Sequence, residues 1–220
     1  MAITLASHGN TGGNTGPPGT YTFTIPITCS AGDVIYVAAY PSMGTGPTLT
    51  GETFSTIATL STFANLYRCV AANAHTSDNI TWSYTGNAIA YYASAEAWTG
   101  VNGTSNVIGA VGNTSASGSS VTLNCSVTTA AANSLTLGFA SCGPFAPTAG
   151  TGYTQTENGS SPGGEVFSEH ANAATGVSGT MVTVPINYSG FGSIYGVAVS
   201  LAPAGLSTPA RRRSHALVIQ

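Results

Sequence analysis

Apolar and polar residues alternate in four well-separated segments of this chain. This period-two alternation is typical of strands that bury one face. Turn residues separate the segments at intervals of about 8 to 12 residues, and no segment has a helical period. The sequence therefore predicts an all-β fold: an antiparallel β-sandwich, jelly-roll-like, with about a dozen strands and no significant helix. The four segments are 21–27, 79–85, 121–127 and 135–139.

A longer apolar run, AIAYYASAEAWTGV at 88–101, predicts the central strand of the fold. Both of its faces are largely apolar, as expected for a strand that is covered on both sides. Alanine also favours helix, but turn residues flank the run on both sides. Glu96 lies in this run. It is expected either to be buried, and then hydrogen-bonded or protonated, or to face a loop near the strand end.

Charge is scarce in this chain of 220 residues, of which only 5% are charged. There is no lysine, and residues 1–208 carry seven acidic side chains against Arg68 alone, a formal charge of −6. A mildly acidic body lacks the basic face that nucleic acids require. The sequence has no 18-residue apolar run and no signal-peptide pattern. We therefore expect neither a membrane span nor classical export. A surface with so few charged side chains is typical of secreted, cell-surface and virion proteins.

Four cysteines are too widely spaced for a zinc motif. They predict either two disulfides or four isolated buried thiols. No metal site and no cofactor are expected. The cysteines are Cys29, Cys69, Cys125 and Cys142.

Glycine-rich stretches predict loops at 8–19, 112–118, 143–152 and 157–164. Pro26 predicts an edge strand or a bulge in its segment. No boundary divides the body, so three parts are expected: an N-terminal arm or loop over 1–19, a β-sandwich domain over 20–205 and a tail over 206–220.

The tail combines a basic cluster with an apolar end. It is either a frayed terminus or a docking peptide, whose apolar residues could add as a strand to a partner's sheet edge. The candidate docking residues are Arg211, Arg212, Arg213, Leu217, Val218 and Ile219.

Several phrases occur in an order that is similar to a diffuse group of phage-encoded and bacterial β-sandwich modules. They are AGDVIYVAAY, the "WTGV" that closes the apolar run, SVTLNCSVTTAAANSLTLGFAS, GTGYTQTENGS and YGVAVSLAPA. The resemblance covers about 20–205. It implies a part of a phage head fibre, capsid decoration protein or tail appendage, or of a bacterial surface protein, and it supplies no catalytic residues.

No catalytic motif stands out, so we expect that the protein is not an enzyme. There is no GxSxG elbow or phosphate-binding loop. His75 near Asp78, and His170 beside Glu169, are more often solvated loop histidines than functional ones. Glu165 and Glu169 are four apart on one strand face, about 13 Å by strand rise, too far for a retaining glycosidase.

Tyr153 and Phe191, in glycine-rich loops, are the candidate glycan contacts among the aromatic residues. The expected function is that of a structural virion protein of a bacteriophage, assembling with other virion proteins and as a homo-oligomer. The alternative is a carbohydrate-binding, adhesive module that is secreted or on a bacterial surface, with host glycans as partners. Neither nucleic acid nor membrane is an expected partner.

Overall fold

The structure is a computed structural model, and the description below covers most of the chain. The described residues are 2–14, 16–40, 45–61, 64–86, 90–104, 106–143, 147–161 and 164–205. They form fifteen strands and no helix, and every strand pairing is antiparallel. The predicted all-β antiparallel sandwich is therefore confirmed.

The strands form three sheets. The five-stranded sheet has the order β1 (Thr4–Asn14), β8 (Ala90–Thr99), β3 (Val34–Tyr40), β6 (Ala64–Val70) and β5 (Ser55–Ser61). The three-stranded sheet has the order β2 (Gly19–Cys29), β7 (His75–Gly86) and β4 (Thr45–Thr48). The seven-stranded sheet has the order β10 (Gly112–Thr128), β15 (Met181–Leu201), β11 (Leu135–Cys142), β14 (Gly164–Ala171) and β13 (Tyr153–Ser161), with β12 (Thr148–Ala149) and β9 (Val107–Ile108) paired to β15.

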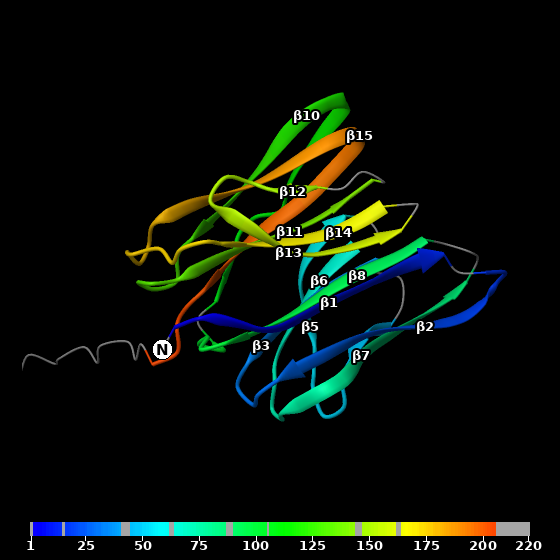
Figure 1. The fold of residues 1–220 in the computed structure, drawn as a ribbon, viewed down its shortest axis with the longest axis horizontal. Helices are drawn as coiled ribbons and strands as arrows, with labels where there is room; N and C mark the ends of the chain where they lie inside the picture. Colours follow the sequence, from blue (N-terminus) through cyan, green and yellow to red (C-terminus); the bar gives the residue numbers. More distant parts are fainter. Residues whose placement is uncertain are drawn as a thin grey trace, which may run out of the picture.

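The five-stranded sheet lies in the middle of the stack (Figure 1). One of its faces packs on the three-stranded sheet through a first core, to which β2, β3, β7 and β8 all contribute. Its other face packs on the seven-stranded sheet through a second core, built from β3, β8, β11 and β15 among others. The alternation of apolar side chains to both sides of β3 and β8 is what allows one sheet to support two cores.

A third core forms because the seven-stranded sheet folds over itself. The long ribbon of β10 and β15 has a register shift between Ser117 and Ser120, with positive φ at Gly118 and Gly192. Glycine tolerates that conformation without steric cost. Residues from the far half of the ribbon then face residues of β11 and β14 across the third core, and β10 and β15 form the top layer in Figure 1.

The described part of the apolar run is β8, which is a strand covered on both faces, as predicted. It pairs with β1 on one side and β3 on the other. Ala93, Ala95 and Ala97 enter the first core, whereas Tyr92 and Trp98 enter the second. Small residues of β8 therefore face the three-stranded sheet, and large residues of β8 face the seven-stranded sheet.

Several loop predictions are wrong. Residues 8–14 belong to β1, residues 112–118 begin β10, and β13 extends to Ser161. Gly13 permits close packing within the sheet instead of forming a turn: a Cβ on it would lie 2.9 Å from the Tyr91 hydroxyl. Pro26, by contrast, lies in β2 at the edge of the three-stranded sheet, as expected.

The four cysteines are free thiols, and all four are buried. Burial raises the pKa of each thiol. Of the two alternatives, the structure has the isolated buried thiols.

Candidate functional site

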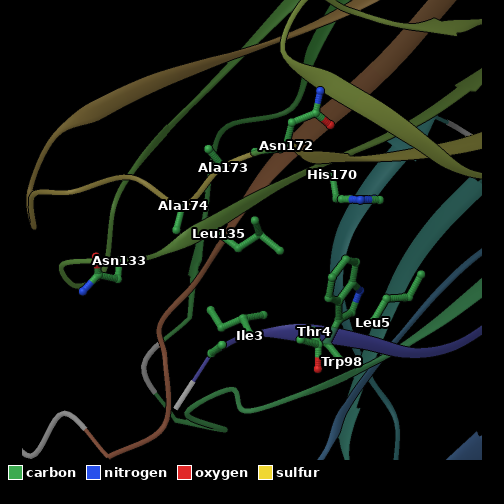
Figure 2. A pocket seen from close by; sticks show the side chains of 12 residues that line it. Ile3, Thr4, Leu5, Trp98, Asn133, Leu135, His170, Asn172, Ala173 and Ala174 are labelled. Carbon is green, nitrogen blue, oxygen red and sulfur yellow. The ribbon is translucent and has the colours of Figure 1, made fainter.

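A cleft of about 700 Å³ opens where the N-terminal end of β1 meets the end of β14 (Figure 2). Ile3, Thr4 and Leu5 form one wall. The opposite wall comes from Leu135 and from the segment after β14. Trp98 and His170, whose rings contact each other, form the part of the lining that we call the floor of the cleft. The remaining lining residues are Ala2, Asn133, Ala171, Asn172, Ala173 and Ala174.

Strand pairing holds both walls of this cleft in place. Leu5 is opposite Trp98 in the pairing of β1 with β8, which brings the first wall next to the floor. An isolated bridge between Ser134 and Thr175 fixes the second wall, and Asn133 adopts a positive φ of 58° to turn the chain there. Asparagine is among the few non-glycine residues that accept this conformation readily.

The two rings of the floor meet edge to face. The centroids of Trp98 and His170 are 5.4 Å apart, with an interplanar angle of 68°. Nδ1 of His170 is hydrogen-bonded to Oγ1 of Thr156 at 2.8 Å. Burial, and secondarily the nearby His8, lower the pKa of His170, so its imidazole is neutral at neutral pH. The floor is thus an uncharged aromatic pair.

Behind the floor, a row of polar side chains crosses the five-stranded sheet on the face that packs against the seven-stranded sheet. His8 of β1 is opposite Glu96 of β8, Glu96 is opposite Tyr36 of β3, and Tyr36 is opposite Arg68 of β6. Cross-strand partners point to the same face, so these four groups are neighbours. We call them the polar row.

Glu157 and Phe139 of the seven-stranded sheet face the polar row. The carboxylate of Glu157 in β13 accepts hydrogen bonds from His8 Nδ1 and from Asn10 Nδ2. The rings of Tyr36 and Phe139 lie 5.6 Å apart between the two sheets. The His8–Glu157 contact therefore ties β1 to β13 across the layer boundary.

Glu96 is fully buried at the centre of this arrangement. Desolvation raises its pKa to about 7, although the Ser168 hydroxyl and the Trp98 indole partly oppose the shift. Trp98 Nε1 donates to Glu96 Oε2 at 2.8 Å. Of the two alternatives drawn from the sequence, the buried and hydrogen-bonded carboxyl is the one found. A buried acid separated from the cleft by Trp98 suits a structural role, because an acid catalyst must reach its substrate.

The two carboxyl groups of β14, those of Glu165 and Glu169, face the third core. Glu165 and Glu169 lie on the same face of the strand, as predicted, and both are buried. Glu169 accepts a hydrogen bond from the Gly150 N–H at 3.0 Å. Desolvation raises the pKa of Glu169 to about 8. These groups are packed inside the fold, and neither lines the cleft described above.

His75 forms a separate polar cluster. Its Nδ1 is 2.8 Å from Asp78 Oδ2, and its Nε2 is 3.0 Å from Glu52 Oε1. The hydrogen bond with Glu52 is the main cause that raises the pKa of His75. His75 is buried, so the expectation of a solvated loop histidine is wrong. Glu52 also accepts hydrogen bonds from the N–H groups of Ala72 and Asn73, so the cluster holds the loop between β6 and β7 in place.

The two predicted glycan contacts have different surroundings. Tyr153 is half-buried, packs on two cores and is hydrogen-bonded to Thr136 Oγ1 at 2.8 Å. Phe191 is 65% exposed, at the bend of the ribbon beside Gly118. The predicted docking residues Arg211, Arg212, Arg213, Leu217, Val218 and Ile219 lie outside the described residues.

Sequence reasoning did not identify the cleft or the polar row. His8 of the polar row and its partner Glu157 are distant in sequence, and neither position carries a motif. Alternation within each strand gives the face of a residue, but the pairing of distant strands decides which polar groups meet.

In the described part of the chain, no group of three or more metal-binding side chains gathers, and no helix is long and apolar enough to cross a membrane. Comparisons with models of protein families, with curated proteins and with solved structures found no match to this chain.

Proposed function

We propose that this chain is a non-enzymatic structural subunit of a bacteriophage particle, a decoration, head-fibre or tail-appendage protein that acts through protein–protein assembly. The observation that carries the proposal is the chemistry of four strands in the two outer sheets. β2, β4, β10 and β15 contain no charged residue at all. Charged side chains are depleted at the centres of protein interfaces, so these surfaces suit contacts with copies of the chain or with other virion proteins.

The outward faces of these strands carry hydroxyl and amide groups in cross-strand pairs. Thr20 and Thr85 are hydrogen-bonded at 2.8 Å on the three-stranded sheet, as are Thr48 and Thr81. On the opposite side of the molecule, Thr122 donates to Asn187 at 2.9 Å. Pairs held in this way lose little side-chain entropy when a neighbour covers them.

Mass spectrometry and electron microscopy of purified particles test this proposal. We expect the chain in stoichiometric copies at a repeated position on the particle, and the isolated protein as a homo-oligomer. A structural subunit cannot be missing from the particle, so its absence from purified particles would contradict the proposal.

An adhesive, glycan-binding module on a bacterial surface or in a secreted protein is the second candidate. Exposed Phe191 favours it, because an accessible ring with hydroxyl groups nearby is a surface on which sugars stack. Ser115 and Ser193, hydrogen-bonded at 3.0 Å, supply such hydroxyls near the bend.

We expect Phe191→Ala to abolish any glycan-array signal, since the exposed ring is the stacking surface. Met181→Ala is the matched control, because Met181 is 74% exposed on the same strand. An equal loss of signal in both variants, or a signal that survives Phe191→Ala, would rule out this site.

A further inference from the structure

The described chain ends beside the cleft. Ala204 N–H donates to the Gly100 carbonyl at 2.7 Å, and Val101 forms a bridge with Pro203. The Ala2 carbonyl lies so close to Gly100 that a Cβ there would meet it. Ala2 in turn lines the cleft. In Figure 1 the red end of the described chain lies next to the label of the N-terminus.

Fifteen residues follow Gly205, with the sequence LSTPARRRSHALVIQ. Leu217 is twelve positions beyond Gly205. An extended chain covers about 3.3 Å per residue, so this stretch spans up to roughly 40 Å. A domain of this length has a radius of gyration of about 17 Å. The apolar end of the tail therefore has enough reach to return to any part of the cleft.

We propose that Leu217, Val218 and Ile219 dock into the cleft of their own chain. The inference goes beyond the assembly role proposed above and does not depend on it. The cleft walls and the tail end are chemically matched, because Ile3, Leu5 and Leu135 are branched apolar side chains like those of the tail. Branched apolar side chains that enter the cleft would contact these three residues and leave water, which is favourable.

Strand addition gives the docked tail a backbone partner. β1 is the outermost strand of the five-stranded sheet, and its first residues form a wall of the cleft. Extended peptides commonly bind by adding to such an edge. Val218 and Ile219 are β-branched, which favours an extended conformation.

The balance of energies makes the docking reversible. The free energy gained by burying three branched apolar side chains is of the same order as the conformational entropy lost when the residues that carry them become ordered. A short tether gives the tail a local concentration on the order of millimolar, so the chain's own tail outcompetes that of a second copy in dilute solution.

Hydrogen exchange of the full-length protein tests the proposal, with mass spectrometry as the readout. The tail variant Leu217→Asp/Val218→Asp should speed exchange severalfold at residues 2–5 and 171–174, and leave residues 120–128 unchanged. Ala174→Arg, on an exposed cleft residue outside the core, should speed exchange of residues 217–219. Val177→Arg is the control, since Val177 is 66% exposed and outside the cleft.

Two further measurements separate the occupants. A synthetic peptide of residues 214–220 should restore protection of the cleft in the tail variant, and a scrambled peptide should not. Equal exchange in the wild type and the tail variant would overturn the proposal. Protection that disappears when the wild type is diluted would also overturn it, because the occupant would then be a second copy.

Discussion

Replacing Glu169 with glutamine is expected to raise the melting temperature by roughly 10 °C at about pH 8 and to change it little at about pH 5. Glu169 lies inside the third core, and its Oε1 has no hydrogen-bond partner among the described residues. Desolvation holds its pKa at about 8, against 4.5 for an ordinary glutamate. The difference corresponds to on the order of 5 kcal/mol, and a chain of this size gains about 2–4 °C per kcal/mol.

Glutamine keeps the shape of the protonated acid. Its amide oxygen can accept the Gly150 N–H in place of the carboxyl Oε2. The groups that face Glu169 offer no cation: Cys125 from β10 and Tyr153 from β13 are its titratable neighbours, and Val184 packs against the same site. Ionised Glu169 is therefore uncompensated, and the neutral amide removes that cost.

The pH dependence of the wild type follows from the same shift. An acid with a raised folded pKa stays protonated in the fold while the unfolded chain releases its proton, so stability falls as pH rises from about 4.5 to about 8. Glu96, with a pKa of about 7, acts in the same direction. So does His75, whose raised pKa means that its stabilisation is lost at high pH. His170 opposes them weakly, because its lowered pKa favours the fold above about pH 6.5.

Glu52→Gln is the matched control, with the opposite sign. Burial alone would raise the pKa of Glu52, but hydrogen bonds from Ala72, His75 and Asn73 lower it. Removal of that charge should destabilise the protein at neutral pH. Thermal unfolding of the two variants across pH distinguishes them, and a melting temperature of Glu169→Gln that tracks the wild type at every pH would contradict the assignment of a buried neutral acid.

Alternation in the sequence was sufficient to predict the outer strands and the class of fold. β2 and the second half of β10 expose one face and bury the other, which is the pattern that alternation records. β8 is buried almost throughout, so its apolar run could be identified as a strand only from its flanking turns.

The errors fell on strands that are rich in glycine. Residues 8–14 of β1 and 157–161 of β13 were predicted as loops because glycine is the usual turn residue. In the fold, Gly9 of β1 and Gly159 of β13 lie where two layers come close, and this closeness depends on strands that are distant in sequence. The candidate site has the same origin, since β1 supplies one wall of the cleft and His8 of the polar row.

Gly159→Ala should therefore be among the most damaging single-methyl additions to this protein. A Cβ on Gly159 of β13 would lie 2.2 Å from the carbonyl oxygen of Ala93 in β8 and 3.0 Å from its nitrogen. Both atoms belong to the backbone of a strand held on two sides, so neither can move as a side chain could. Overpacking of this kind typically costs 1–3 kcal/mol, or about 2–12 °C in melting temperature for a chain of this size.

Gly176→Ala is the matched control, because a Cβ on Gly176 meets nothing within 4 Å. Exposed substitutions of this kind usually change stability by less than about 0.5 kcal/mol. The comparison isolates the close approach from the general effect of replacing glycine with alanine, since both variants lower the entropy of the unfolded chain alike.

The damage should also be local. Glu157 lies two residues before Gly159 on the same face of β13, so pushing β13 away from β8 separates Glu157 from His8 and Asn10. Hydrogen exchange should quicken in β1 and β13 and stay unchanged in β2 and β7, which pack on the opposite face of the five-stranded sheet. Equal melting temperatures for Gly159→Ala and Gly176→Ala would contradict this prediction. They would mean that β13 and β8 do not approach closely at Gly159, and that the close approach does not explain why β13 has a glycine there.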